Sequence, residues 1–147
     1  MGSGGMDLND ITVSSTARPI VGYIKVSREG EPYLCGTRCE GCAEIFLGPR
    51  RACGRCGGQD FTETRLAPRG RLYNYTIVHR SFPGVPTPFV SAIVELDGGG
   101  VIKGTLDGVP APLDAVQFDM PVRVVFKEIA AAGAGEEPFL GFSFRPL

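Results

Sequence analysis

Two Cys-x-x-Cys pairs, Cys39–Cys42 and Cys53–Cys56, constrain the fold of this chain more than any other feature of the sequence. Ten residues separate the pairs. Each pair can form a tight turn that offers two thiolates from one side, so all four sulfurs can bind one tetrahedral ion. Glycines in and after the pairs suit such turns, because they permit positive φ and leave backbone N–H groups free to point at the sulfurs. The pattern predicts a closed four-cysteine zinc ribbon.

Two other chemistries of the four cysteines stay open at this point. Disulfides suit small secreted chains, but no secretory signal precedes the cysteines. Iron can occupy the same tetrahedral sulfur cage, as in rubredoxins, although this chain has no tryptophan and a shorter gap between its pairs than rubredoxins usually show. We therefore expect Zn²⁺. With four protein ligands no position is left for water or substrate, so the metal should stabilise the fold, by about 10 kcal/mol or more.

Cys35 is a fifth cysteine and makes the count odd. Three residues separate it from Cys39, which is not the two-residue spacing of a ribbon turn. We therefore leave Cys35 outside the site, since a spare thiol near zinc is more often inert than reactive.

The near-neutral charge and the lack of long apolar runs limit the classes of partner. A formal net charge of −1 over 147 residues argues against non-specific nucleic-acid binding, which needs a basic surface. No run approaches the length of a membrane span, and residues 1–5 lack the features of a signal peptide. We expect a cytoplasmic protein with no nucleic-acid or membrane partner.

The charge is unevenly distributed along the chain. Residues 50–71 contain six arginines against two carboxylates, a local balance of +4, so the remainder carries −5. A basic ribbon favours a phosphate-bearing partner. A zinc ion with four thiolates is formally −2, however, and nearby arginines can compensate it. The sequence leaves both interpretations open.

Many turns and little helix are expected, because 21 glycines and 12 prolines are spread among short apolar runs. We expect an extended N-terminal arm over residues 1–34, with strands at 11–13 and 20–26. The zinc ribbon is expected over residues 35–66, and a second domain over residues 67–147.

Five strand-like runs in the second domain alternate between apolar and polar residues or are rich in β-branched and aromatic ones. In one of them Val90, Ala92, Val94 and Leu96 share a face. The five runs are residues 72–78, 88–96, 101–106, 122–127 and 140–144. Five strands with one apolar face predict a small closed barrel of the OB type, so the expected fold class is mainly β: a rubredoxin-like zinc ribbon followed by an OB-fold barrel.

Five segments, which together span about residues 30–147, carry a resemblance to a known family. They are residues 38–42, 49–57, 70–80, 92–96 and 120–126. The ribbon alone is not specific, but its combination with Tyr-Thr-Ile-Val-His-Arg and Met-Pro-Val is. On these motifs the chain resembles the acyl-CoA-associated zinc-ribbon/OB-fold proteins long classed as a domain of unknown function. Many members open with a helical hairpin, whereas residues 8–26 here look extended.

The resemblance implies a non-catalytic, zinc-binding accessory subunit of a thiolase-type enzyme that acts on a 3-oxoacyl-CoA. Members of the family usually act as small partners of thiolase-like enzymes, sometimes of enoyl-CoA hydratases, and in archaea of a thiolase and hydroxymethylglutaryl-CoA synthase pair. The chain is similar in particular to the small zinc-finger subunits of benzoylsuccinyl-CoA thiolases of anaerobic toluene degradation. A hetero-oligomer with a thiolase-like catalytic subunit is therefore expected, with CoA or acyl-CoA as a further candidate ligand.

The sequence holds too few reactive groups for thiolysis by this chain alone. That reaction needs an acylated cysteine, a base for the CoA thiol and an oxyanion hole. The chain has one histidine, His79, and four of its five cysteines are assigned to metal. We expect no catalytic residue here and interpret His79 and Arg80 as support for the loop that follows.

Arginines and a proline-rich loop are the candidate contacts for CoA and for a partner. The phosphates of CoA suit bidentate arginines, and the candidates are Arg50, Arg51, Arg55 and Arg80. Residues 81–89 hold three prolines and two phenylalanines, and such a stiff apolar loop loses little entropy on docking. Phe82, Pro83 and Phe89 are therefore candidate partner contacts, unless the phenylalanines fold back under the barrel.

Two other classes of function remain open. OB folds with zinc ribbons also bind single-stranded nucleic acid on aromatic residues in a basic groove, for which Tyr73 and Tyr75 are candidates. The barrel half is acidic, however, and the chain has only three lysines. Rubredoxin-like electron transfer is the other class, and a red colour of the purified protein would support it.

Overall fold

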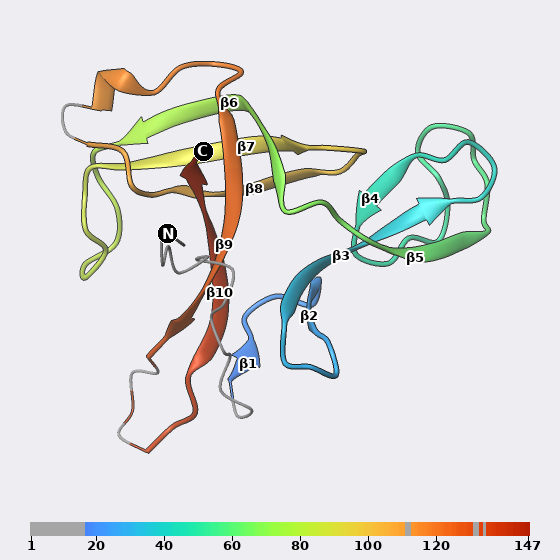
Figure 1. Ribbon diagram of the computed structural model, residues 1–147, viewed down its shortest axis with the longest axis horizontal. Coiled ribbons are helices and arrows are strands. Elements are labelled where there is room, and N and C mark those ends of the chain that lie inside the picture. The colour runs from blue at the N-terminus through green and yellow to red at the C-terminus, as the bar shows by residue number, and fades with distance from the viewer. Residues whose placement is uncertain (1–16, 111–112, 131–132, 134) are drawn as a thin grey trace, which may run out of the picture.

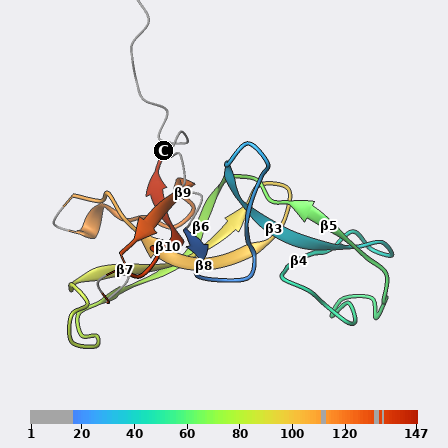
Figure 2. The same ribbon diagram turned by 90° about the horizontal axis from the view of Figure 1, so that it is seen from below.

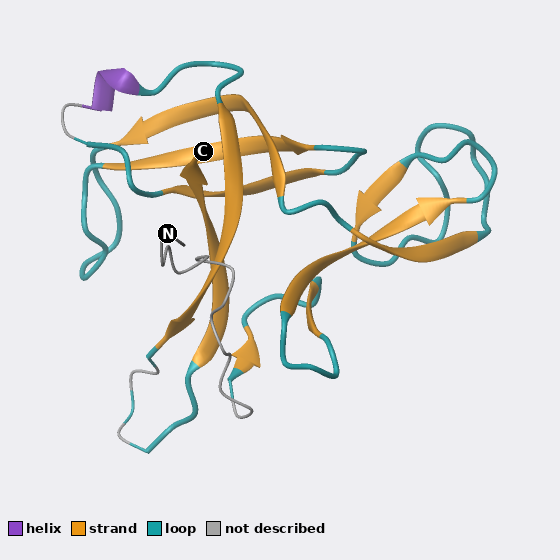
Figure 3. Ribbon diagram, viewed as in Figure 1, coloured by secondary structure: helices purple, strands orange, loops and turns teal. Residues whose placement is uncertain are grey.

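The computed structural model describes residues 17–110, 113–130, 133 and 135–147. These residues form strands, turns and one short 3₁₀ helix, η1 (Leu113–Ala115), which confirms the predicted mainly β fold (Figures 1 and 3). The strands are β1 (Arg18–Pro19), β2 (Ile24–Val26), β3 (Pro32–Cys39), β4 (Ile45–Leu47), β5 (Phe61–Arg65), β6 (Arg69–Val78), β7 (Phe89–Leu96), β8 (Val101–Leu106), β9 (Pro121–Ile129) and β10 (Phe139–Pro146). No helix in the described part of the chain combines the length and the apolar character that crossing a membrane requires.

Strands β6 to β10 close into a five-stranded barrel. β6, β7 and β8 pair in sequence as antiparallel neighbours, and β9 and β10 form a second hairpin. A parallel bridge between Phe144 and Leu106 joins β10 to β8, and residues 121–123 of β9 pair with residues 69–71 of β6. This strand order is the OB topology expected from the five apolar runs.

The alternation of apolar residues decides which face of each strand points into the barrel. Val90, Ala92, Val94 and Leu96 are each at most 3% exposed, as their spacing in the sequence predicts. The other strands contribute buried residues at the same period, and the barrel core includes Leu72, Ile102, Leu106, Val116, Val122, Val124, Leu140 and Phe144.

A bulge interrupts β6 after its fourth residue, Leu72. The pairing register with β7 shifts between Leu72 and Asn74, so Tyr73 is the extra residue and is 66% exposed. The end of β7 near this bulge turns into β8 through Gly98, Gly99 and Gly100, all with positive φ, as the predicted glycine hairpin requires.

The N-terminal arm differs in part from its expected course. Residues 20–26 do not form one strand: residues 20–23 make a bend and turn, and only Ile24–Val26 is a strand, because the Ile24 N–H bonds to the Val21 carbonyl and reverses the chain. The strand expected at residues 11–13 lies outside the described residues. β1 pairs with β10 in parallel, and β2 forms an antiparallel hairpin with β3.

β3 runs from this hairpin into the ribbon, where it pairs with β4 on one side and β5 on the other. The ribbon lies at the end of the barrel where β7 turns into β8 (Figure 2). A Cβ on Gly99 would lie 2.9 Å from Cδ1 of Ile45, and one on Gly100 would lie 3.5 Å from Cδ2 of Leu66. The absence of these side chains therefore lets the ribbon contact the barrel turn.

Candidate metal centre

The two Cys-x-x-Cys segments fold into turns with the same backbone pattern. In the first, the Cys39 N–H bonds to the Glu44 carbonyl and the Ala43 N–H bonds to the Cys39 carbonyl. In the second, the Cys53 N–H bonds to the Gly58 carbonyl and the Gly57 N–H bonds to the Cys53 carbonyl. The residue after each pair is left-handed, with φ of 65° at Ala43 and 75° at Gly57. Each turn thus presents two sulfurs from one side.

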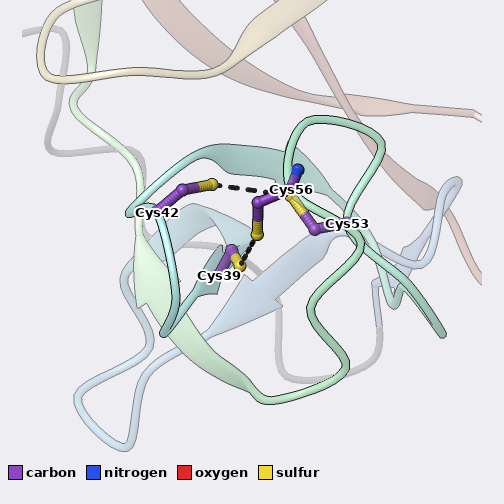
Figure 4. A group of neighbouring side chains, drawn as sticks. All are labelled: Cys39, Cys42, Cys53 and Cys56. Carbon is purple, nitrogen blue, oxygen red and sulfur yellow. Dashed lines mark hydrogen bonds between the residues drawn. The ribbon is translucent and has the colours of Figure 1, made fainter.

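The two turns bring the four sulfurs together (Figure 4). All four Sγ atoms of Cys39, Cys42, Cys53 and Cys56 lie within 4.8 Å of one another. The Cys39–Cys56 and Cys42–Cys53 sulfur pairs are each 3.6 Å apart. Sulfurs at the corners of a tetrahedron around zinc, with Zn–S bonds of about 2.3 Å, are separated by about 3.8 Å. The described donor set therefore fits a four-coordinate metal ion.

Backbone N–H groups point at the sulfurs, as the glycine content of the turns predicts. The N–H groups of Arg55 and Cys56 lie 3.3 and 3.5 Å from Sγ of Cys53, and the N–H of Gly58 lies 3.4 Å from Sγ of Cys56. A Cβ on Gly58 would lie 3.3 Å from the same sulfur. Such N–H donors stabilise thiolates over thiols.

The pKa values of Cys42 and Cys53 move in opposite directions, because the two sulfurs lie close together. The N–H groups of Cys56 and Arg55, with the neighbouring thiols, lower the pKa of Cys53 to about 6. The N–H of Glu44 lowers the pKa of Cys42, but burial and the three other cysteines outweigh it and raise that pKa to about 12. Ionisation of one cysteine therefore raises the pKa of its neighbour, and a bound cation would offset this repulsion between thiolates.

The geometry supports a structural role for an ion at this centre. Cys39 and Cys53 are buried, Cys42 is half-buried and Cys56 is exposed, so the centre lies near the surface of the ribbon. Four sulfur ligands complete a tetrahedral shell, which leaves no position for a reacting group. Cys35 lies apart from the cluster, buried on β3 opposite Arg65 of β5. Burial and the charge of Glu63 raise the pKa of its thiol, and Lys25 lowers that pKa by less. The raised pKa disfavours reactivity.

The structure divides the arginines expected near CoA between the two ends of the molecule. On the ribbon, Arg55 donates to Glu44 at 2.9 Å, and the guanidinium carbon of Arg50 lies 4.5 Å from the centre of the Phe46 ring. Arg51 is exposed. Arg80 follows the far end of β6, a ten-residue strand that can span up to about 30 Å (Figure 1). One compact anion site does not form from all four.

The proline-rich loop between β6 and β7 protrudes from the end of the barrel opposite the ribbon (Figure 1). Residues 79–88 are all exposed, and Phe82 is 83% exposed, so Phe82 does not fold back under the barrel. Phe89 starts β7 and is half-buried. His79 is exposed at the beginning of the loop, next to Arg80.

Two features of the ribbon were missed in the sequence. Glu44 pairs with Arg55 across eleven positions of the chain, and Gly36 lies against Leu66, whose Cδ2 would be 2.6 Å from a Cβ on that glycine. The Glu44 pair connects the two cysteine turns, and Gly36 belongs to a strand pairing that the spacing of residues does not encode. No local pattern would have found either contact.

A four-cysteine ribbon joined to a closed OB barrel defines a class of two-part β proteins. In the comparison with known proteins, residues 63–127 match the model of the ChsH2 C-terminal OB-fold domain. A DUF35 domain-containing scaffold protein of Methanocaldococcus jannaschii is 31% identical over 118 residues, covering 78% of this chain and 82% of the relative. The chain belongs to the DUF35 family.

Two further relatives are named as parts of enzymes. The benzoylsuccinyl-CoA thiolase subunit BbsA of Thauera aromatica is 30% identical over 116 residues, covering 79% of this chain and 78% of that subunit. A solved structure, the Ltp2-ChsH2(DUF35) aldolase, has a TM-score of 0.59 and 30% sequence identity, covering 78% of this chain and 84% of the matched chain. The matched regions cover more than three quarters of this chain and of each relative.

Proposed function

We propose that this chain is an accessory subunit of a thiolase-type enzyme complex, organised by one zinc ion bound to Cys39, Cys42, Cys53 and Cys56. The proposed domains are an arm over residues 1–34, a ribbon over 35–66 and an OB domain over 67–147. In this proposal a separate catalytic subunit cleaves a 3-oxoacyl-CoA in the cytoplasm. The observation that carries it is the match, over most of both chains, to a protein named as a thiolase subunit.

The chemistry of the described residues supports a role without catalysis by this chain. The four clustered thiols fit a closed metal shell, and the fifth thiol, Cys35, is buried with a raised pKa. His79 is exposed at the start of a protruding loop, far along β6 from the ribbon. A nucleophile, a base and an oxyanion hole must lie together for acyl transfer, so the partner is proposed to supply them.

The acyl group is proposed to be one that the partner recognises, with benzoylsuccinyl-CoA as the first compound to try. That choice rests on the name of the Thauera aromatica relative. CoA contact by Arg51 on the ribbon or Arg80 on the barrel is a separate proposal. All four candidate arginines are exposed, but Arg50 and Arg55 already contact Phe46 and Glu44.

The decisive experiment is native purification of the full chain from its own host, followed by mass spectrometry of what accompanies it. We expect a thiolase-sized subunit whose CoA-dependent cleavage of the 3-oxoacyl-CoA falls when the small chain is removed and returns when it is added back. A chain that purifies alone, or with nucleic acid, would contradict the accessory role. Metal analysis of the same sample should give one zinc per chain and no colour, whereas a red, iron-containing protein would support electron transfer.

A matched pair of variants distinguishes the loss of a metal ligand from the loss of the spare thiol, Cys35. Cys53→Ser removes a ligand and should release zinc and the partner, because the ribbon depends on the ion. Cys35→Ser changes a cysteine outside the cluster and should keep both. Normal zinc content and partner binding in Cys53→Ser would overturn the assigned ligand set.

A further inference from the structure

Three arginines lie side by side on the outer face of the barrel, one on each of three neighbouring strands. The pairing of β6 with β9 sets Arg69 opposite Arg123, and the pairing of β9 with β10 sets Arg123 opposite Arg145. Val122 and Phe144, which precede two of these arginines, are fully buried, so the alternation of the strands turns the arginines outward. We call Arg69, Arg123 and Arg145 the arginine row.

No ion pair involves the arginine row among the residues that the structure describes. Two acidic groups of the barrel pair with other cations: Asp107 lies 3.2 Å from Nζ of Lys127, and Asp119 lies 3.6 Å from Nη1 of Arg71. Like charges directly opposite each other on neighbouring strands repel. The row is therefore a strip of positive charge that destabilises the free chain and that an anionic partner would compensate.

Two of the three side chains are partly packed against the barrel. Arg123 and Arg145 are half-buried. The guanidinium of Arg145 lies over Gly108, where a Cβ would be 2.9 Å from its Nε atom. A side chain that is already packed loses less conformational entropy when its guanidinium binds a carboxylate or phosphate. The row therefore offers restrained guanidinium groups to a partner.

The spacing of the row favours carboxylates on a helix over other anions. Neighbouring strands are about 4.8 Å apart, so the row presents a positive group at intervals of about 5 Å. On an α-helix, side chains four residues apart have Cβ atoms about 5–6 Å from each other. A helix lying across the three strands, with Asp or Glu once per turn, can therefore offer one carboxylate to each arginine.

Exposed aromatic residues continue from the same strands. β6 leads from Arg69 to the bulge at Tyr73, which is 66% exposed, and the segment before β9 holds Phe118, which is 64% exposed. The Leu72 N–H bonds to the Met120 carbonyl, so these two segments are neighbours. Arginines together with exposed aromatic residues are typical of protein interfaces. We infer that the arginine row is a docking site for an acidic helix of a protein partner.

The first test needs only the purified full chain. The probes are two alanine-rich helical peptides of equal composition, one with glutamate at every fourth position and one with the glutamates in a single block. The variant Arg123→Gln/Arg145→Gln removes the centre of the row, and Arg28→Gln/Arg38→Gln removes the same charge from exposed residues elsewhere. We expect the spaced peptide to bind the wild type and the control, and to bind the row variant at least about tenfold more weakly.

The free chain gives a second readout in the same experiment. Removal of charges that repel should raise the melting temperature of the row variant by a few degrees, while the control changes little. Equal peptide binding by both variants would overturn the inference. So would tighter binding of a single-stranded oligonucleotide than of the spaced peptide, because it would assign the row to phosphate.

The second test uses the complex of this chain with its catalytic subunit. That the partner is this subunit rests on the proposed function. The co-purified complex of the row variant should dissociate at lower salt than the complexes of the wild type and the control. If the wild type captures no catalytic subunit, the proposed function fails, and the peptide titration alone decides whether the arginine row binds an acidic helix. If the row variant holds the catalytic subunit as tightly as the control at every salt concentration, the row is not its docking site and the proposed function stands.

Discussion

The ribbon and the barrel are both built from β-strands, but different interactions stabilise them. The barrel closes around aliphatic and aromatic side chains that alternate along its five strands, several of them fully buried. The ribbon strands β4 and β5 contain only half-buried and exposed residues, and the buried groups at the cysteine turns are Cys39 and Cys53. A barrel of this kind can be stabilised by apolar burial, whereas the ribbon requires an ion or another link between its turns.

The contrast teaches that the two halves are encoded by different kinds of sequence information. A period of two residues specifies each barrel strand, and moderate changes at any one position leave the others in place. A ribbon depends on four sulfurs at fixed spacing, so the loss of one removes the whole centre. The two halves meet at Leu66, which packs with the barrel core and against Gly36 of the ribbon.

The largest effect should come from Cys53→Ser. The loss of one ligand should cost the ribbon about 10 kcal/mol of metal-binding free energy, while the barrel keeps its apolar core and its fold. Backbone NMR spectra with zinc analysis would show this as lost dispersion for residues 35–66 alone. Collapse of the barrel signals as well would show that the two halves fold as one unit.

A smaller loss of stability, confined to the barrel, is expected from Phe144→Ala. Phe144 is fully buried, its ring centre is 5.7 Å from that of Phe142, and Gly104 makes room for it. Removal of the ring should lower the free energy of unfolding by about 3–5 kcal/mol, with unchanged zinc content. Chemical denaturation measures the loss, and Phe82→Ala, at an exposed position, is the control that should change stability by less than about 0.5 kcal/mol.

Gly36→Ala tests the contact between the halves. The new Cβ would lie 2.6 Å from Cδ2 of Leu66 and 3.0 Å from the Phe46 carbonyl, so one of them must shift. We expect a loss of about 1–3 kcal/mol, from overpacking, that affects ribbon and barrel signals together. Gly22→Ala has nothing within 4 Å of its Cβ and serves as the control. Equal stability of the two variants would mean that the ribbon and the barrel do not depend on this contact.

The smallest effects on stability are expected at the residue that follows each cysteine pair, where the two turns can be compared. Ala43 and Gly57 occupy equivalent positions with φ of 65° and 75°, a region that costs a residue with a Cβ about 1 kcal/mol. Gly57→Ala should therefore lower stability by about 1 kcal/mol, whereas Ala43→Gly should be neutral or stabilising by less than about 1 kcal/mol. Thermal unfolding of the zinc-bound chain measures both. A loss in Ala43→Gly as large as that in Gly57→Ala would show that the turns are not equivalent.

The sequence alone determined the parts of this protein that depend on residues close together in the chain. The spacing of Cys39, Cys42, Cys53 and Cys56 predicted a cluster that the structure contains, and the apolar alternation predicted the five barrel strands. Both signals are local, because a tight turn or a strand places its side chains by its own backbone geometry. The same local reasoning extended β2 to residues 20–26, where the chain instead turns before Ile24.

Only the tertiary structure decided which distant residues become neighbours. Arg69, Arg123 and Arg145 are far apart in the sequence and form a row because barrel closure fixes the register of β6, β9 and β10. Arg80 is separated from the ribbon arginines for the same reason, since β6 carries it along the barrel to the other end. Strand register depends on how the whole sheet closes and packs its core, and that information is not contained in the spacing of residues along any one strand.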